Sequence, residues 1–88
     1  MARKLRVEYP GAVYHVMSRG SERRDIFLDD RDKEFFLSLF SRAFKKYGLL
    51  VHAYVLMDNH YHLLVETPEG NLSTVMKWMN VTYSSYFN

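Results

Sequence analysis

Apolar and polar positions alternate in some stretches of the chain and repeat at helical spacing in others, which predicts three β-strands and two α-helices. The first strand is predicted over residues 12–18, after the turn signal Tyr9-Pro10-Gly11. Successive residues of a strand point to opposite faces. The two faces of this strand therefore carry Val13, His15 and Met17 on one side, and Ala12, Tyr14 and Val16 on the other.

The first helix is predicted to begin at Asp29 or Asp30, because either side chain can cap the free N–H groups of a helix N-terminus. Gly48 is well placed to end it. Between these points, apolar residues at helical spacing form the expected core-facing stripe: Phe36, Leu39, Phe40, Ala43, Phe44 and Tyr47. Lys45 and Lys46 are expected on a solvated face.

Two further strands are predicted over residues 49–56 and 60–65, joined by a loop that contains the turn formers Asp58 and Asn59. The length of this loop decides which face of the earlier strand meets the core, and a two-residue loop would reverse its faces. We prefer a three-residue loop over residues 57–59, because it gives the more uniformly apolar core. It directs three residues toward the helices: Val51, Ala53 and Val55. It places His52 on the same face as His60 and His62.

The second helix is predicted to begin with Asn71 or Ser73 as its cap. Its apolar side carries Leu72, Val75, Met76, Met79, Tyr83 and Tyr86. The resulting order, β-α-β-β-α, is a ferredoxin-like α+β unit, βαββα(β), without its last strand. In that fold the first and third strands are neighbours in an antiparallel sheet with both helices on one face. His15 would then stand beside His60 and His62, and the edge of the first strand would be unpaired, which favours dimerisation.

The composition restricts the class of protein. A chain of 88 residues with 48% apolar residues is expected to form one small globular domain, residues 1–88. The absence of cysteine excludes disulfides and thiolate catalysis. No apolar run has the ~20 residues of a membrane span. The sequence therefore predicts a soluble, cytoplasmic protein with no membrane partner.

Positive charge is concentrated in the first 24 residues, although the net charge of the chain is only +2. This segment contains two acidic residues and six basic ones: Arg3, Lys4, Arg6, Arg19, Arg23 and Arg24. Such a basic segment suits contacts with nucleic acid phosphates, or a solvated tail and loop.

His60 and His62 project from the same face of their strand, because they are two residues apart. Two adjacent imidazoles on a rigid strand can bind a divalent ion. The His-x-His spacing taken alone is also common among structural histidines, so the pattern leaves both interpretations open.

Two segments together resemble a known family. They are Tyr9-Pro10-Gly11-Ala12-Val13-Tyr14-His15-Val16-Met17-Ser18-Arg19-Gly20 and Met57-Asp58-Asn59-His60-Tyr61-His62-Leu63-Leu64-Val65-Glu66. They resemble the REP-associated tyrosine transposases, within the insertion-sequence (two-hundred-like) transposases that have a His-hydrophobic-His motif and one catalytic tyrosine. The resemblance extends to Arg23-Arg24-Asp25-Ile26-Phe27 and to Asn71-Leu72-Ser73.

The resemblance implies a ferredoxin-like HUH endonuclease of mobile elements that cuts and rejoins single-stranded DNA, often at hairpins. It implies that His60 and His62 bind Mg²⁺ or Mn²⁺. His15, which is expected beside this pair, is a candidate for a third ligand or a supporting partner. A tyrosine would attack the phosphate and leave a 5′-phosphotyrosine.

The resemblance implies a further strand and a C-terminal helix after the second helix, and it places the nucleophilic tyrosine on that C-terminal helix. This sequence ends at Asn88. We therefore expect a shortened domain whose nucleophile lies beyond Asn88. Tyr83 and Tyr86 are weak candidates, because their spacing favours a place in the core, and Tyr61 should face away from the histidines. Trp78 and Lys77 are equally explained as DNA contacts or as surface residues.

Two other interpretations stay open. One is a non-catalytic DNA-hairpin-binding module that uses the basic residues. A ferredoxin-like sheet can also bind RNA through stacked aromatic residues, but the aromatic pattern of those domains is missing here. The other is a decayed transposase remnant that dimerises without a ligand.

Overall fold

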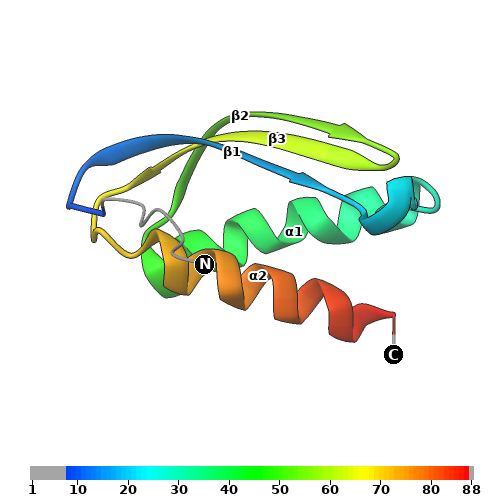
Figure 1. The fold of residues 1–88 in the computed structure, drawn as a ribbon. Helices are drawn as coiled ribbons and strands as arrows, with labels where there is room; N and C mark the ends of the chain where they lie inside the picture. The colour runs from blue at the N-terminus through cyan, green and yellow to red at the C-terminus, as the bar shows by residue number, and fades with distance from the viewer. Residues whose placement is uncertain (1–7, 88) are drawn as a thin grey trace.

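The computed structural model describes residues 8–87, except for the side chain of Arg23, and consists of one antiparallel sheet covered on one face by two helices (Figure 1). The elements in chain order are β1 (Ala12–Arg19), a 3-10 turn η1 (Ser21–Arg23), α1 (Asp30–Tyr47), β2 (Leu50–Met57), β3 (His60–Thr67) and α2 (Leu72–Tyr86). The sheet order is β1-β3-β2, and both pairings are antiparallel. This is the predicted ferredoxin-like α+β arrangement.

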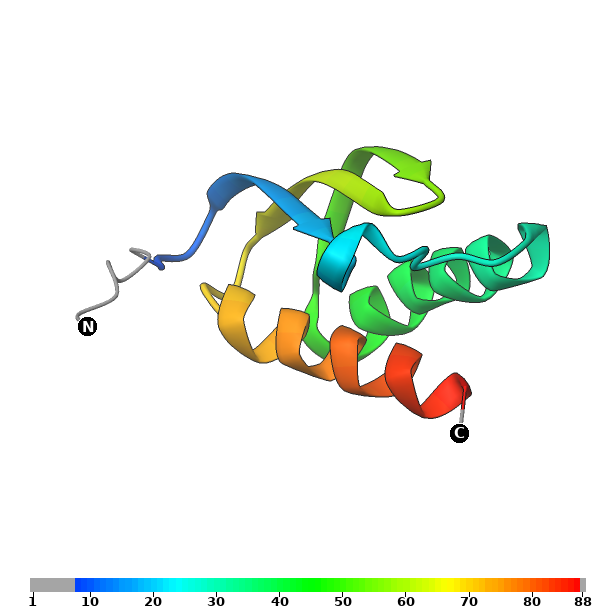
Figure 2. The ribbon, with the colours of Figure 1, turned by 45° about the vertical axis from the view of Figure 1, so that its right-hand side comes forward.

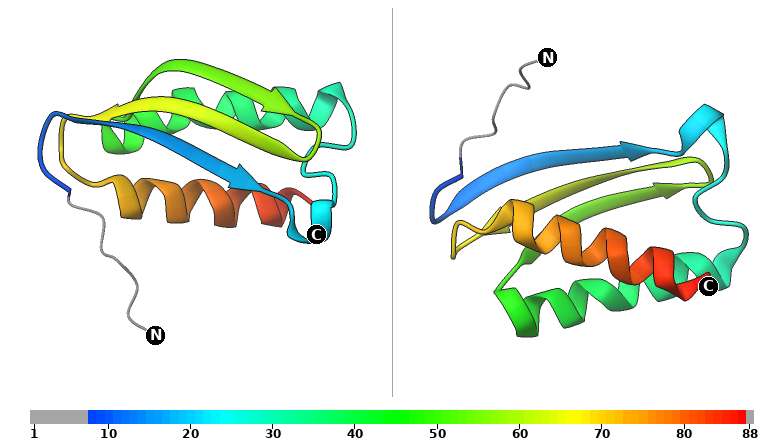
Figure 3. Two further views of the ribbon diagram at one scale, coloured as in Figure 1. Left: turned by 45° about the horizontal axis from the view of Figure 1, so that its top comes forward. Right: turned by 60° about the horizontal axis from the view of Figure 1, so that its bottom comes forward.

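The two helices lie side by side beneath the sheet, and the opposite face of the sheet is not covered by any helix of the described chain (Figures 2 and 3). The predicted pairing of the first and third strands is confirmed. The outer edge of β1 has no partner strand within residues 8–87, also as predicted. Dimerisation through this edge stays a prediction.

Helix α1 begins and ends where the sequence predicts. The Asp29 carboxylate accepts the backbone N–H groups of Arg31 and Asp32 at 3.0 and 3.2 Å. Gly48 adopts the left-handed conformation (φ 77°), and its N–H donates to the Phe44 carbonyl. The stripe is buried at its centre but not throughout, because Phe44 is 55% exposed. Phe44 lies at the margin of the stripe, where it lines a surface hollow between α1 and β2 instead of packing in the core.

The core lies between the helices and the inner face of the sheet. Four aromatic rings from different elements meet there with centroid separations of 4.9–6.4 Å: Phe27, Phe36, Tyr61 and Tyr83. In β1, Ala12 and Val16 are buried and Val13, His15 and Met17 are exposed, which confirms the two predicted faces.

The predicted register of β2 is wrong near the turn. The hairpin has the two-residue turn Asp58-Asn59, with Met57 opposite His60 and Leu56 opposite Tyr61. Backbone N–H groups of Gly20, Ile26 and Phe27 donate to the Asp58 and Asn59 carbonyls, which holds the turn in this form. Consequently Tyr54 and Leu56 lie on the helix side, whereas Ala53 and Val55 lie on the open face and are exposed.

A β-bulge at His52 reverses this change of face farther along β2. The register shifts between Val51 and Ala53, so that Val51 again lies opposite the buried Val65. The extra residue of the bulge, His52, lies on the open face and bonds to Glu66. The predictions that Val51 faces the helices and that His52 shares the face of the histidine pair are therefore confirmed, although the loop that led to them is wrong.

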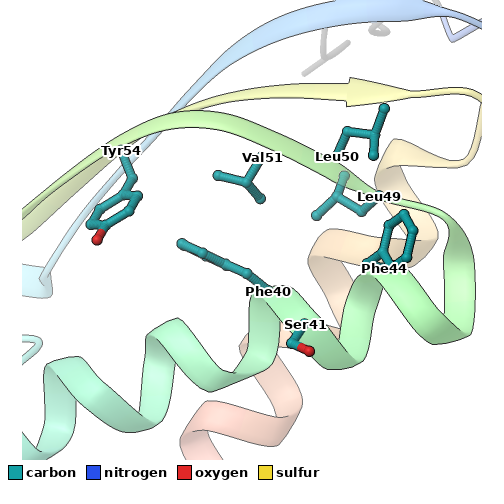
Figure 4. A pocket seen from close by; sticks show the side chains of 7 residues that line it. All are labelled: Phe40, Ser41, Phe44, Leu49, Leu50, Val51 and Tyr54. Atoms are coloured by element: carbon teal, nitrogen blue, oxygen red, sulfur yellow. The ribbon is translucent and has the colours of Figure 1, made fainter.

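An apolar hollow of about 320 Å³ lies between α1 and β2 (Figure 4). Phe40 and Phe44 line it from the helix, and Tyr54 lines it from the strand. Phe40 and Tyr54 meet edge to face at 5.6 Å. The hollow follows from the bulge, because the bulge brings Val51 and Tyr54 to the same side of β2.

Helix α2 is capped by a residue far away in the sequence. Neither predicted cap acts through its own side chain, since Asn71 makes no capping bond and its amide instead donates to the Tyr47 carbonyl at 3.2 Å. The Glu8 carboxylate accepts the Ser73 N–H at 3.0 Å and the Ser73 hydroxyl at 2.5 Å. A carboxylate at this position is favourable, because the N-terminal end of a helix is positive.

Candidate metal centre on the open face of the sheet

Three histidines meet on the open face, as the sequence predicts. Pairing of β1 with β3 sets Met17 opposite His62 and Arg19 opposite His60, so His15 lies diagonally beside His62. The His15 Nε2 and His62 Nδ1 atoms are 2.9 Å apart, and the two rings stack with centroids 5.1 Å apart. The His60 and His62 rings are nearly perpendicular, with centroids 5.3 Å apart.

A neighbouring hydrogen bond sets the orientation of His60. Its Nδ1 atom lies 2.8 Å from the amide oxygen of Asn59. An amide oxygen only accepts hydrogen bonds, so Nδ1 carries the proton and the lone pair is on Nε2. The sequence pattern indicated Asn59 only as a turn former. An amide directly before the first histidine is the signal that indicates this role of Asn59.

His62 has an equivalent arrangement. Its Nδ1 atom is occupied by His15, and its Nε2 atom makes no hydrogen bond to any residue in the described part of the chain. When Nδ1 of His62 donates to Nε2 of His15, Nε2 of His62 keeps its lone pair. His60 and His62 can therefore each present an Nε2 lone pair to an ion, whereas the Nε2 atom of His15 is already hydrogen-bonded to His62.

The donor set suits a metal ion only in part. Within residues 8–87 no group of three or more histidine, aspartate, glutamate or cysteine side chains is placed to hold an ion. Two imidazoles with free Nε2 atoms can supply two ligands, and Mn²⁺ or Mg²⁺ takes its other ligands readily as oxygen from water or phosphate. The residues present thus fit a two-histidine site that is completed by a substrate.

The turn that carries Asn59 is held by three backbone hydrogen bonds from other parts of the chain. The Asp58 carbonyl accepts the N–H groups of Ile26 and Phe27 at 2.6 and 3.0 Å, and the Asn59 carbonyl accepts the Gly20 N–H at 2.9 Å. The loop after β1 therefore braces the turn from which His60 starts.

His52 lies on the same face but does not belong to this group. It is exposed, and its Nε2 atom is 2.9 Å from the Glu66 carboxylate. Glu66 is four residues along β3 from His62, about 13 Å at the usual rise of a strand. His52 and Glu66 therefore form a separate surface pair.

The surroundings of the histidines are apolar. Exposed large side chains of the three strands lie on this face: Val13, Met17, Val55, Met57 and Leu64. The sequence predicts Val13 and Met17 beside His15, whereas Val55 and Met57 reach this face through the two-residue turn. A shallow hollow of about 130 Å³ is lined by His15 and His62 together with Val55 and Leu64. Exposed apolar patches of this kind mark binding surfaces more often than chance.

The predicted DNA-binding residues divide into two groups. Arg19 pairs with His60 in the sheet and is exposed, so it lies at the histidine site. Arg24 is exposed in the bracing loop, and its guanidinium is 3.7 Å from the Glu22 carboxylate. The remaining four lie outside the described residues or have an undescribed side chain: Arg3, Lys4, Arg6 and Arg23.

The tyrosines within residues 8–87 are poorly placed to act beside the histidines, because none lies on the open face of the three strands. Tyr83 is buried, as predicted, and its hydroxyl donates to the Ile26 carbonyl at 2.7 Å. Burial and the nearby Asp32 carboxylate raise the pKa of Tyr83. A raised pKa disfavours the tyrosinate that a nucleophile requires.

Tyr86 and Tyr61 are no better placed. The predicted core position of Tyr86 is wrong, because this residue is the last of α2, is 39% exposed and stacks on Phe35 with ring centroids 4.1 Å apart. A hydrogen bond to the Asp32 carboxylate raises the pKa of Tyr86. Tyr61 is buried beneath the sheet, as predicted, and burial raises its pKa.

Comparison with known proteins identifies the family. Residues 8–88 match the family model described as "Transposase IS200 like". No curated protein and no solved structure gives a significant match. Neither described helix is long and apolar enough to cross a membrane. The match spans the sheet, both helices and the histidine strand, and the chain therefore belongs to the family of IS200-like transposases.

Proposed function

We propose that this transposase domain nicks and rejoins single-stranded DNA beside hairpins, with His60 and His62 as ligands of a Mg²⁺ or Mn²⁺ ion. The observation that carries the proposal is the orientation of the pair: each Nδ1 atom is engaged by a neighbour, and each Nε2 atom is left for a ligand. Metal-binding histidines commonly have this second hydrogen bond, which sets the ring and the tautomer. The ion would polarise the scissile phosphate and stabilise the charge that develops during attack.

The residues of the chain have distinct tasks in this proposal. Asn59 and His15 hold the two imidazoles in place, and the exposed apolar side chains around them give DNA bases an apolar surface to contact. Arg19 is exposed beside His60, where it can contact a phosphate. Arg24, and the predicted DNA-binding residues outside the description, would bind farther along the strand.

The reaction exchanges one phosphate ester for another. The tyrosine oxygen bonds to phosphorus, the bond from phosphorus to the 3′ oxygen breaks, and the tyrosine proton ends on the released 3′-hydroxyl. The reverse reaction rejoins DNA without a nucleotide cofactor. We infer that the nucleophile reaches the open face from outside the sheet, because the strands carry no tyrosine there.

The test is titration calorimetry with Mn²⁺ on the wild type and on His60→Ala/His62→Ala, beside cleavage of a labelled DNA hairpin. His52→Ala is the matched control, because it removes an exposed imidazole from the same face. We expect binding that is lost only in the double variant. Equal Mn²⁺ binding by all three proteins, or cleavage by the double variant, would refute the metal site.

The alternative is a DNA-hairpin-binding module without catalysis, as an intact domain or as a decayed remnant. It is favoured by the absence of a third metal ligand and of a tyrosine on the open face among the described residues. This alternative predicts DNA binding that survives His60→Ala/His62→Ala, weakens in Arg23→Ala/Arg24→Ala and yields no covalent adduct.

A further inference from the structure

A second charged surface lies on the helical layer, on the side of the sheet away from the histidines. Three cations of α1 and one aromatic residue of α2 line a hollow of about 330 Å³: Arg42, Lys45, Lys46 and Trp78. Arg42 and Lys46 are four residues apart, so they project from the same side of α1. We call these four residues the helical patch.

Aromatic contacts hold the patch together. The Arg42 guanidinium carbon lies 5.3 Å from the centroid of the Trp78 ring, and the Lys46 Nζ atom lies 5.9 Å from it. Tyr47 meets Trp78 edge to face at 5.8 Å, and Lys46 also lies 5.7 Å from the Tyr47 ring. Two cations are thus positioned beside one indole, within the distance at which a ring attracts a cation.

The charges of the patch are not neutralised by carboxylates. Arg24, Arg31 and Lys33 each form an ion pair, whereas no cation of the patch pairs with a carboxylate of residues 8–87. The sequence from residue 35 to residue 57 contains no acidic residue, and neither does the sequence from residue 70 to residue 88. Glu69 lies beside Gly48 at the end of α1, and the Glu8 carboxylate is bound by Ser73 at the N-terminus of α2.

We propose that the helical patch is a second DNA-binding surface, which holds the phosphate backbone of a strand that leads away from the histidine face. The proposal rests on DNA as the substrate of this transposase. Arginine and lysine without carboxylate partners are the residues that bind phosphates, and an adjacent aromatic ring supports single-stranded nucleic acid. The same charges would also suit an acidic protein, in which case polyglutamate would quench Trp78 as well as DNA does.

Trp78 makes the proposal directly testable, because it is the only tryptophan of the chain. The smallest extent of the molecule is 23 Å, which is about seven nucleotides at the 3.4 Å spacing of a fully stacked strand, so a flank of about 20 nucleotides is long enough to pass from one face to the other. The probe is therefore an unlabelled DNA hairpin with a single-stranded flank of about 20 nucleotides. We expect this probe to quench Trp78 emission, in the wild type and equally in His60→Ala/His62→Ala.

Two double variants of equal net charge distinguish binding at the helical patch from a general effect of net charge. Lys45→Gln/Lys46→Gln removes two charges inside the patch, and Arg31→Gln/Lys33→Gln removes two at the other end of the same helix. Each lost contact with single-stranded DNA lowers the slope of log K against log salt by about 0.7, so we expect a decrease of about 1.4 in the first variant only. Circular dichroism confirms that both variants are folded.

Three results would overturn the proposal. The first is binding of labelled DNA, seen by anisotropy, with no change in Trp78 emission. The second is an equal slope of log K against log salt in both charge variants. The third is quenching of Trp78 by polyglutamate at the same charge concentration as DNA. None of them depends on Mn²⁺ binding. Loss of the metal in His60→Ala/His62→Ala while Trp78 still responds would support the patch and the metal site independently.

Discussion

Replacement of Tyr83 by phenylalanine tests whether this tyrosine has a structural role or a chemical one. The change removes only the hydroxyl, which donates to the Ile26 carbonyl at 2.7 Å, and it keeps the ring 5.5 Å from Phe27 and from Phe36. A net hydrogen bond contributes about 0.5–1.5 kcal/mol, and a buried carbonyl left without a donor costs about 1–3 kcal/mol. We therefore expect Tyr83→Phe to lower the free energy of unfolding by about 1–2 kcal/mol.

Thermal unfolding followed by circular dichroism measures this loss. In a domain of this size, 1 kcal/mol corresponds to about 4–8 °C in the melting temperature, so a decrease of about 4–16 °C is expected. Tyr9→Phe is the matched control, because it removes the hydroxyl of a tyrosine that is 57% exposed, and no resolvable change is expected. Equal melting temperatures for the wild type and Tyr83→Phe would refute the reasoning about the buried hydroxyl.

The pH dependence gives a second readout of the same group. Folding raises the pKa of Tyr83 above its ordinary value of 10, so the unfolded chain loses this proton first as the pH rises. The stability that the neutral hydroxyl contributes is complete below pH 10 and is lost above it. Wild-type stability should fall above pH 10, and Tyr83→Phe should show a smaller fall. A covalent DNA adduct made by the wild type but not by a folded Tyr83→Phe would identify Tyr83 as the nucleophile and contradict its structural assignment.

Two further predictions concern the histidine site. Gly20→Ala should lower the free energy of unfolding, measured with urea, by about 1–3 kcal/mol. The added methyl group would collide with the Arg24 carbonyl, next to the hydrogen bond from the Gly20 N–H to the Asn59 carbonyl. Unchanged stability would show that the bracing loop can move to make room for the methyl group. If the proposed metal site exists, His15→Ala should weaken Mn²⁺ binding by about 10–100-fold through His62, whereas His52→Ala should not. Calorimetry distinguishes the two variants, and equal affinities would exclude a positioning role for His15.

Local patterns predicted most of the elements of this fold. The limits of α1 follow from Asp29 and Gly48, which act on the backbone next to them. The meeting of His15 with His62 followed from the order of the strands in a ferredoxin-like sheet combined with period-two alternation. The cap of α2 could not be found in this way, because Glu8 lies 65 residues before Ser73 and no local pattern connects them.

The sequence by itself determined the order of the elements and the shared face of His60 and His62 on one strand. Helix periodicity, strand alternation and capping act between residues close together in the chain. Only the tertiary structure decided the face of β2, because that strand is apolar at almost every position and a two-residue turn and a bulge set its register. It also brought Arg42 and Lys46 of one helix beside Trp78 of the other. These features depend on distances between segments that pack together only when the chain has folded.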